Sequence, residues 1–294
     1  MTKIQYLLNS YIMVKEIFFS FILFLISLSS NCQNSDEYQV FALKYLAGGK
    51  IPAKNYAVGA NPKDSIDATL MIWLLKGENG RNILVDAGCL DTVVKTRFSL
   101  KGYIRPDSLL ERINVYPSDI TDIILTHPHW DHIGGINLFP KAKVWMQKDD
   151  FDYFVGEAWQ ENGNSGAFQK NDVRNIIEIN LQGRLKLVKG DDIEIMPGIR
   201  VFIGSTHSFE NMYLLVNSNS KTNKILIASD AIWFYYNLNN LLPATRCFDP
   251  VAYVEAMKRI KTLVPNPDLI IPGHDNLIFS KFQKVAEGIV RIGN

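Results

Sequence analysis

The chain has only three cysteines in 294 residues, Cys32, Cys89 and Cys247. A small secreted domain held together by disulfides needs several cysteine pairs, so that class of protein is excluded. Cys89 and Cys247 can form at most one bridge, and two separate thiols fit the sequence equally well. Cys89 follows Asp86-Ala-Gly88, where a strand is expected to end, and a small packing residue is the simplest role for it.

An excess of charge of either sign is also absent. The formal net charge is +1, and residues 1–31 carry Lys3, Lys15 and Glu16, which together also give +1, so the remainder of the chain is neutral. No run of Lys or Arg forms the basic patch that is typical of nucleic-acid enzymes. We therefore expect no nucleic-acid partner.

Long apolar runs are missing except near the N-terminus, where residues 17–28 carry no charge. Twelve apolar residues are too few to span a bilayer comfortably, so the sequence predicts a signal peptide over residues 1–32 rather than a stable membrane span. Met13 is an alternative start. Cys32 allows lipid attachment as a second possibility, although Asn31 is a poor match to the small residue expected before it. We expect an exported protein, periplasmic or secreted, either free or lipid-anchored through Cys32.

Internal repeats and low-complexity tracts are absent as well. At 47% hydrophobic and 21% charged residues, the composition is close to the average of globular proteins. The length that remains after the leader suits one large α/β domain, over residues 38–294.

What the chain does contain is a spaced pattern that includes all five of its histidines. The members are His127, His129, Asp131 and His132 in one short block, and His207, Asp230 and His274 on three later segments. Imidazole is the commonest protein ligand of transition metals, and a carboxylate can bridge two cations. The pattern therefore predicts a metal-dependent enzyme rather than histidines that only satisfy hydrogen bonds at a sheet edge.

The short block also has a consistent local geometry. Residues 121–125 are an apolar run typical of a buried strand, and the ligands begin where that run ends, as sites in α/β proteins do. Pro128 favours an extended conformation at His127, so His127 and His129 should point the same way and hold one ion. Gly134-Gly135 allows close backbone approach beside the next two ligands, which are free to hold a second ion.

These residues resemble the metallo-β-lactamase superfamily. The likeness rests on His-x-His-x-Asp-His at 127–132, His207, Asp230 in Ala228-Ser-Asp-Ala231, His274 in Pro272-Gly-His-Asp275, and Asp86 in Ile83-Leu-Val-Asp-Ala-Gly88. It implies an α/β fold, an αββα sandwich of two packed mixed sheets flanked by helices. It further implies two divalent ions, most simply Zn²⁺, in a site at one sheet edge.

By the same resemblance, His127, His129 and His207 would hold the first metal, and Asp131, His132 and His274 the second. Asp230 would bridge the two, and Asp86 would orient a ligand histidine. The alternative for Asp86 is an acid that merely ends a strand.

Within the superfamily the chain is most similar to the N-acyl homoserine lactonases. The shared features are Tyr116-Pro-Ser-Asp119, Met196-Pro-Gly198, Phe248-Asp-Pro250 and Gly273-His-Asp275, while Ser205-Thr-His-Ser-Phe209 departs from the family's Pro-Gly-His-x-Pro-Gly form. The resemblance implies hydrolysis of a small lactone, quorum quenching, and a monomer or homodimer. Alternatives are a β-lactamase, a thioesterase or glyoxalase-like hydrolase, and a catalytically silent metal-binding protein.

In this family Asp131 would carry a proton to the leaving alkoxide. The family's tyrosine three residues after the bridging aspartate is replaced by Trp233, which can donate but not accept a hydrogen bond. We expect Tyr235 or Tyr236 to supply the hydrogen-bond donor to the substrate carbonyl instead. The alternative is that both are rim aromatics.

The remaining elements are expected as follows. Strands are predicted at residues 68–75, 81–85, 193–203, 212–216, 224–228 and 269–271, and helices at 108–113, 250–263 and 281–292. The helix at 250–263 should turn Val251, Val254, Met257 and Ile260 inward. Residues 150–175 mix aromatics with glycines, which indicates either a mobile loop with an apolar lining or a helix and loop packed on the core.

Overall fold

The computed structural model describes residues 37–78, 80–97, 102–219 and 224–293. The predicted signal peptide and Cys32 lie outside these residues. Within them, every helix is too short or too polar to cross a lipid bilayer.

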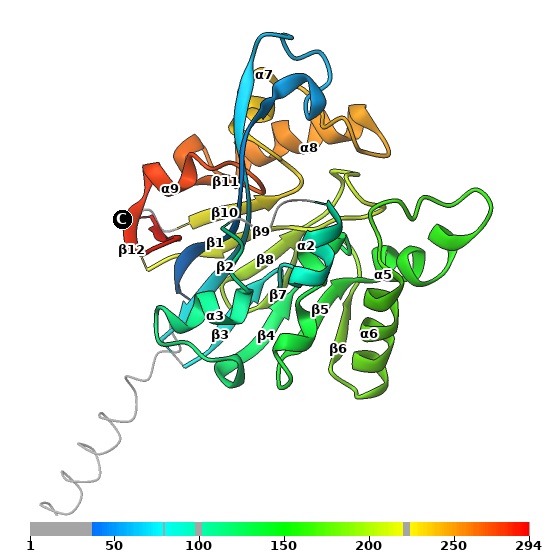
Figure 1. Ribbon diagram of the computed structural model, residues 1–294, viewed down its shortest axis with the longest axis vertical. Coiled ribbons are helices and arrows are strands. Elements are labelled where there is room, and N and C mark those ends of the chain that lie inside the picture. The colour runs from blue at the N-terminus through cyan, green and yellow to red at the C-terminus, as the bar shows by residue number, and fades with distance from the viewer. Residues whose placement is uncertain (1–36, 79, 98–101, 220–223, 294) are drawn as a thin grey trace, which may run out of the picture. The chain divides into compact units, whose positions relative to one another are not determined.

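In the described part of the chain the strands form two mixed sheets (Figure 1). The first has eight strands in the order β12-β13-β1-β2-β3-β4-β5-β6, and the second has five in the order β11-β10-β9-β8-β7. The strands are β1 Tyr38–Pro52, β2 Ser65–Gly77, β3 Asn82–Val85, β4 Ile120–Ile124, β5 Lys143–Gln147, β6 Leu185–Val188, β7 Ile193–Met196, β8 Ile199–Phe202, β9 Tyr213–Asn217, β10 Lys224–Ser229, β11 Ile270–Pro272, β12 Gln283–Ala286 and β13 Ile289–Ile292.

Helices connect and cover these strands. They are α2 Asp91–Arg97, α3 Pro106–Glu111, α4 Trp130–Ile133, α5 Lys148–Val155, α6 Lys170–Leu181, α7 Tyr235–Asn240, α8 Pro250–Leu263 and α9 Ile278–Lys281. Short 3-10 turns are η1 Ala53–Asn55, η2 Pro117–Asp119, η3 Ile136–Leu138, η4 Glu157–Trp159 and η5 Pro267–Leu269.

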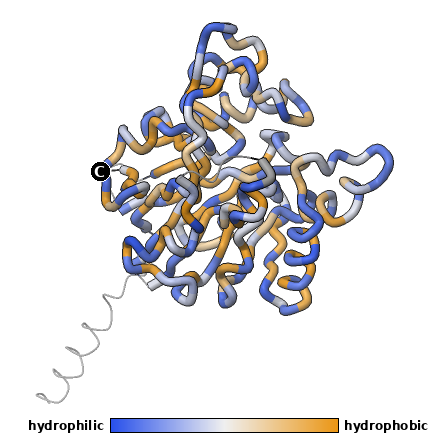
Figure 2. Tube along the Cα trace, viewed as in Figure 1, coloured by the Kyte–Doolittle hydropathy of each residue, from blue (hydrophilic) through white to orange (hydrophobic). Residues whose placement is uncertain are grey.

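Two apolar cores hold the layers together, because the buried strands carry apolar residues on both faces. One core joins the inner faces of the two sheets and includes Trp73 of β2, Tyr213 of β9 and Met257 of α8. The other lies between the outer face of the eight-stranded sheet and helices α3, α5 and α6. Figure 2 shows the hydrophobic positions concentrated along the strands. The predicted sandwich of two mixed sheets with outer helices is therefore confirmed.

The strands predicted at 68–75 and 81–85 are confirmed and pair as a hairpin, and the helix at 250–263 is also confirmed, but two other expectations are wrong. Residues 281–292 are not a helix, since α9 ends at Lys281 and β12 and β13 follow as a hairpin that pairs with β1. Gly288 has φ 76° at the turn, and β-branched residues dominate the final strand, both of which favour a hairpin. Residues 193–203 likewise form two strands, because the chain turns at Pro197-Gly198.

The inward face of α8 is also shifted from the prediction. Met257 and Ile260 are buried as expected, together with Tyr253, but Val251 is 72% exposed. The hydroxyl of Tyr253 donates to the carbonyl oxygen of Asp230 at 2.9 Å, which turns Tyr253 rather than Val251 toward the sheet.

Residues 150–175 adopt the second of the two predicted arrangements, a helix and loop packed on the core. Helix α5, the turn η4 and the start of α6 account for most of the segment, and Tyr153, Phe154 and Phe168 are buried. Cys89 is buried and Cys247 half-buried, and no disulfide joins them.

Candidate metal centre

The predicted ligands all follow the ends of strands and meet at one edge of the sandwich. His127, His129, Asp131 and His132 follow β4 in the eight-stranded sheet, whereas His207, Asp230 and His274 follow β8, β10 and β11 in the five-stranded sheet. The structure therefore brings all seven side chains together, as two neighbouring groups with one carboxylate between them.

Tight backbone packing shapes the turn that carries the first block. Helix α4 begins directly after His129, which is extended with φ −68° and ψ 150°. A Cβ atom on Gly135 would lie 2.1 Å from the carbonyl oxygen of Ala87, and one on Gly134 would lie 2.7 Å from that of Trp130. Gly135 is needed because the turn packs directly on the segment after β3, and Gly134 is needed because a side chain there would clash with the backbone of α4 itself.

The first group consists of His127, His129, His207 and Asp230. Nδ1 of His129 lies 3.0 Å from Nε2 of His127 and 3.0 Å from Nε2 of His207. Oδ2 of Asp230 lies 3.1 Å from Nε2 of His207 and 3.8 Å from Nε2 of His127. Three imidazole nitrogens and a carboxylate oxygen thus converge on one point, which is the ligand set of a tetrahedral transition-metal site.

The second group consists of Asp131, His132 and His274 around the other oxygen of Asp230. Oδ1 of Asp230 lies 3.0 Å from Nε2 of His274 and 3.4 Å from Nε2 of His132. Oδ2 of Asp131 lies 3.8 Å and 3.9 Å from Nε2 of His132 and Nε2 of His274. Nε2 of His132 and Oδ1 of Asp230 are buried and have no hydrogen-bond partner among the described residues, so this pair of atoms is arranged for a ligand.

The outer ring nitrogens show which way the rings are turned. Nδ1 of His207 donates to the carbonyl oxygen of Arg246 at 2.8 Å, and Nδ1 of His274 donates to that of Thr69 at 3.1 Å. A carbonyl can only accept, so each Nδ1 carries a proton and each ring turns its Nε2 inward. Ring nitrogens and carboxylate oxygens gathered around one point are the donor set of a cation, so the residues fit two metal ions.

The pKa values of the ligand histidines also indicate that the site favours bound positive charge. Burial and the neighbouring His132 lower the pKa of His127 well below its usual value, and burial and His207 do the same for His129. Burial also lowers the pKa of His132, but the carboxylates of Asp230, Asp86 and Asp131 outweigh it and raise the pKa to about 10. Protons that these carboxylates hold on the second group would be displaced by a divalent cation.

Asp86 lies directly behind the second group. Its carboxylate accepts from Nδ1 of His132 at 2.8 Å and from the backbone N–H of Thr126 at 2.8 Å. The hydroxyl of Ser229 also donates to it, at 3.2 Å. Asp86 is fully buried and joins the ends of β3, β4 and β10, so it is placed to orient His132.

The loop that carries His207 is held by side chains instead of the proline and glycine of the related motif. The backbone N–H of His207 donates to Oδ1 of Asn211 at 3.0 Å. The hydroxyl of Ser208 donates to Asp150 of α5 at 2.8 Å, and the Tyr153 ring of the same helix stacks on Phe209 with a centroid distance of 4.7 Å. No sequence signal pointed to these anchors.

Sequence reasoning also missed three other contacts at the site. The hydroxyl of Tyr45 donates to the carbonyl oxygen of Asp131 at 2.7 Å, and Nε1 of Trp233 donates to Oδ2 of Asp230 at 2.6 Å. A Cβ atom on Gly273 would lie 2.4 Å from Oδ1 of Asp230, so only glycine leaves room for that carboxylate. Of these, the glycine before His274 was the only one visible in the motif.

The structure does not bring Tyr235 or Tyr236 to the histidines, which corrects the expectation that one of them faces the substrate. The Tyr236 hydroxyl donates to Asp64 at 2.8 Å, on the segment between β1 and β2. The Tyr235 hydroxyl is buried without a hydrogen-bond partner among the described residues, and the Lys281 ammonium lies 4.6 Å from its ring centroid. Both residues lie in the first turn of helix α7, which begins at Tyr235.

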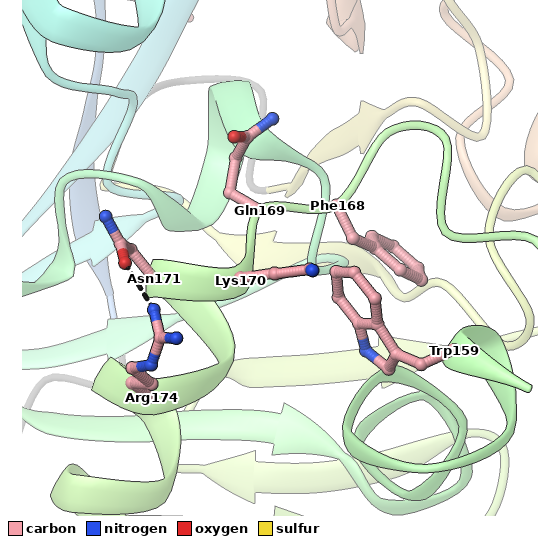
Figure 3. Close-up of a pocket in the computed structure, with 6 residues that line it drawn as sticks. All are labelled: Trp159, Phe168, Gln169, Lys170, Asn171 and Arg174. Atoms are coloured by element: carbon pink, nitrogen blue, oxygen red, sulfur yellow. Dashed lines mark hydrogen bonds between the residues drawn. The ribbon is translucent and has the colours of Figure 1, made fainter.

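A pocket of about 490 Å³ lies between η4 and the start of α6. Figure 3 shows its lining by Trp159, Phe168, Gln169, Lys170, Asn171 and Arg174. The centroid of the Phe168 ring lies 5.5 Å from that of His129, so Phe168 separates the pocket from the first ligand group. Its rim carries the exposed cations of Lys170 and Arg174.

Comparisons with known proteins agree with this geometry. The chain is 26% identical to an N-acyl homoserine lactonase of a Bacillus species over 228 residues, 73% of this chain and 84% of that protein. It is 24% identical over 249 residues to N-acyl homoserine lactonase AiiA of Bacillus thuringiensis subsp. kurstaki, which covers 79% of this chain and 92% of AiiA.

Among solved structures, a quorum-quenching N-acyl homoserine lactone lactonase superposes with a TM-score of 0.65 at 21% identity, covering 84% of this chain and 96% of that one. AidC, described as a dizinc quorum-quenching lactonase, superposes with a TM-score of 0.60 at 18% identity, covering 88% and 97%. The profile of the metallo-beta-lactamase superfamily matches residues 71–274, a range that includes every one of the seven converging ligands. The chain belongs to the metallo-β-lactamase superfamily.

Proposed function

We propose that the protein is a two-metal hydrolase that opens the lactone ring of N-acyl homoserine lactones. The observation that carries the proposal is the position of Asp230, whose Oδ2 faces His207 at 3.1 Å while its Oδ1 faces His274 at 3.0 Å. One carboxylate shared by two ligand groups is the arrangement of a two-metal hydrolytic site. The lactonases among its relatives supply the substrate class.

We assign one ion to His127, His129 and His207, the other to Asp131, His132 and His274, and the bridge to Asp230. The imidazole-rich ligand set, with no cysteine among the ligands, favours Zn²⁺ among the common divalent ions. Two such ions, when bound, would activate a water molecule as the nucleophile and polarise the lactone carbonyl.

The chain's own residues then handle the proton. Asp131 has a side chain that is 12% exposed, against 3% for Asp230, so Asp131 is the ligand carboxylate that a substrate can reach. As water forms the new C–O bond and the ring C–O bond breaks, Asp131 takes the proton from the water and delivers it to the leaving alkoxide. The Tyr45 hydroxyl on the carbonyl oxygen of Asp131 keeps that residue in place.

The acyl chain would lie in the pocket beside His129. Phe168 and Trp159 give that pocket an apolar wall, which suits a hydrocarbon chain attached to the lactone ring.

The test uses the zinc-loaded protein and three substrates, N-hexanoyl homoserine lactone, a β-lactam and an acyl thioester. We expect proton release on lactone opening, together with loss of activity in Asp131→Asn. Asp122→Asn is the matched control, because Asp122 is a buried aspartate of β4 that accepts only from Nε1 of Trp145 among the hydrogen bonds between described residues. If the protein hydrolyses the β-lactam or the thioester but not the lactone, the proposed substrate class is wrong, although the protein is still a hydrolase.

We also propose that the protein acts outside the cytoplasm. Support comes from the charge-free run at residues 17–28 after Lys15, which has the length of a signal-peptide core. The same proposal allows lipid attachment at Cys32.

A further inference from the structure

Trp233 is almost completely buried between histidines of the two ligand groups. Its ring centroid lies 5.1 Å from that of His207 and 6.4 Å from that of His274. Its Nε1 donates a hydrogen bond of 2.6 Å to Oδ2 of Asp230. With 6% of its surface exposed, the indole has no room to exchange this partner for water.

The backbone of Trp233 is tied to the same site. Its carbonyl oxygen accepts from the N–H of His274 at 2.9 Å, and the carbonyl of Ile232 accepts from the N–H of Gly273 at 2.9 Å. The turn after β10 is therefore fixed to the segment after β11, and the indole approaches Asp230 from a rigid backbone. Trp233 contacts the carboxylate through its side chain and a metal-site histidine through its main chain.

The indole makes the two oxygens of Asp230 inequivalent. Oδ2 accepts from Trp233 and lies 3.1 Å from Nε2 of His207 in the first group, with Nε2 of His274 at 3.2 Å. Oδ1 lies 3.0 Å from Nε2 of His274 and 3.4 Å from Nε2 of His132, both in the second group, and has no hydrogen-bond partner among the described residues. Rotation about the Cβ–Cγ bond would break the indole bond, so that bond fixes which oxygen serves which group. An indole N–H neither accepts nor releases a proton near neutral pH, so this role is geometric and not acid–base.

We propose that Trp233 is a positioning residue that holds Asp230 in its bridging orientation and thereby secures the second metal ion. The inference rests on the two-metal site proposed above. If Asp230 rotates, each group loses its shared oxygen. The first group keeps three imidazoles, with Nδ1 of His129 3.0 Å from Nε2 of each of the other two, whereas the second keeps two imidazoles and Asp131, whose Oδ2 lies 3.8 and 3.9 Å from them. The second ion should therefore be the one that depends on Trp233.

The test measures metal affinity by competition with a chromophoric zinc chelator, so no substrate is involved. Trp233→Phe keeps an aromatic ring against His207 and removes the donor. We expect the more weakly held ion to bind about 10- to 100-fold less tightly, as is usual when the hydrogen-bond partner of a metal ligand is removed. The first ion should keep its affinity.

Trp73→Phe is the matched control. Trp73 is fully buried in the core between the sheets, and its Nε1 has no hydrogen-bond partner among the described residues, so the same substitution removes volume and no bond. If both variants lose metal equally, the effect is one of packing and the inference is wrong. It is equally wrong if Trp233→Phe binds both ions as tightly as the natural protein.

A second replacement at the same position keeps the inference testable if the Trp233→Phe variant does not fold. Incorporation of 3-benzothienyl-alanine at position 233 keeps the shape of the indole and replaces only the N–H by sulfur. Loss of the second ion in that protein supports the inference, and full retention overturns it. If the natural protein binds two ions but does not hydrolyse the lactone, the proposed substrate is wrong. The effect of Trp233 on metal affinity can still be measured, because that test uses no substrate.

Discussion

Oδ2 of Asp86 lies 2.8 Å from Nδ1 of His132, and both side chains are buried. The bond joins the segment after β3 to the second ligand group and fixes the orientation of the imidazole. A ligand histidine in metal sites usually has such a partner, which sets its tautomer and its ring direction.

Asp86→Asn should weaken binding of the second zinc ion by about 10- to 100-fold, because an amide cannot accept all of the hydrogen bonds that the carboxylate now accepts. Chelator competition measures the change. Asp122→Asn, which alters a buried aspartate on the neighbouring strand β4, should bind both ions normally. Equal affinity in Asp86→Asn and the natural protein would show that His132 is oriented by packing alone.

The metal content of the purified protein should be close to two ions per chain, since seven ligands cannot all serve one tetrahedral ion. Asp230→Ala should lower it to about one, because without the shared carboxylate only the first group keeps three imidazoles. Elemental analysis of protein produced with added zinc gives the number. One ion per chain, unchanged by Asp230→Ala, would rule out the two-metal arrangement.

Tyr235→Phe and Tyr236→Phe should each change kcat for a lactone by less than about twofold, far below the effect of losing an oxyanion donor. The Tyr236 hydroxyl donates to Asp64, and the Tyr235 hydroxyl is buried without a hydrogen-bond partner among the described residues, with the Lys281 ammonium 4.6 Å from its ring centroid. Steady-state kinetics on N-hexanoyl homoserine lactone decide the matter. A drop of about 10²-fold in either variant would mean that α7 moves when substrate binds.

Asp172 makes the stability of the protein depend on pH. Its carboxyl is buried near the start of α6, Oδ2 has no hydrogen-bond partner among the described residues, and burial raises its pKa from 3.8 to about 7. Between these values the unfolded chain releases the proton that the folded chain retains, so the stabilising contribution falls as pH rises and is fully lost above about 7.

Asp172→Asn should therefore be more stable than the natural protein at pH 8, by up to about 4 kcal/mol, and the difference should shrink toward pH 4. Urea unfolding at several pH values measures it. The neighbouring Asn171→Ala, which alters an uncharged residue of the same turn, should give a pH-independent difference. A constant difference for Asp172→Asn would contradict the raised pKa.

Export should depend on the apolar run at residues 17–28. Replacing Ile22 and Leu25 by Arg should retain the protein in the cytoplasm, because two charges disrupt the hydrophobic segment that the secretion machinery binds. Cell fractionation followed by immunoblotting measures the location, and an unchanged location would show that this run does not direct export. The same fractionation of a Cys32→Ala variant separates a cleaved secreted form from a lipid-anchored one.

The sequence was sufficient to predict the ligands because each is a chemically distinctive residue placed after an apolar run. His207, Asp230 and His274 lie far apart in the chain, yet each follows a strand, and strands of one sheet deliver their ends to a shared edge. The fold, two mixed sheets with outer helices, was predicted from the resemblance of these residues to the metallo-β-lactamase superfamily.

The remaining features depend on local geometry that residue types do not reveal. Trp233 reaches Asp230 only because Ser229 adopts a left-handed conformation, with φ 45°, and turns the chain back after β10. The final hairpin was misread as a helix because residues 281–292 contain apolar residues at spacings compatible with both structures, and Gly288 alone marks the turn. Ser208, in the loop that carries His207, donates to Asp150 of helix α5, which lies 58 positions earlier in the chain. Local sequence patterns cannot reveal a contact over that distance.

Each proposed ion takes ligands from both layers of the sandwich, since the block after β4 belongs to the eight-stranded sheet, and His207, Asp230 and His274 belong to the five-stranded one. A bound ion would therefore be a cross-link between the two sheets, in addition to the apolar packing and the hydrogen bonds that already join them. The unfolded chain cannot present these ligands together, so free metal raises the unfolding free energy in proportion to the logarithm of its concentration. Withholding the metal would therefore lower the stability of the fold as well as remove the proposed activity.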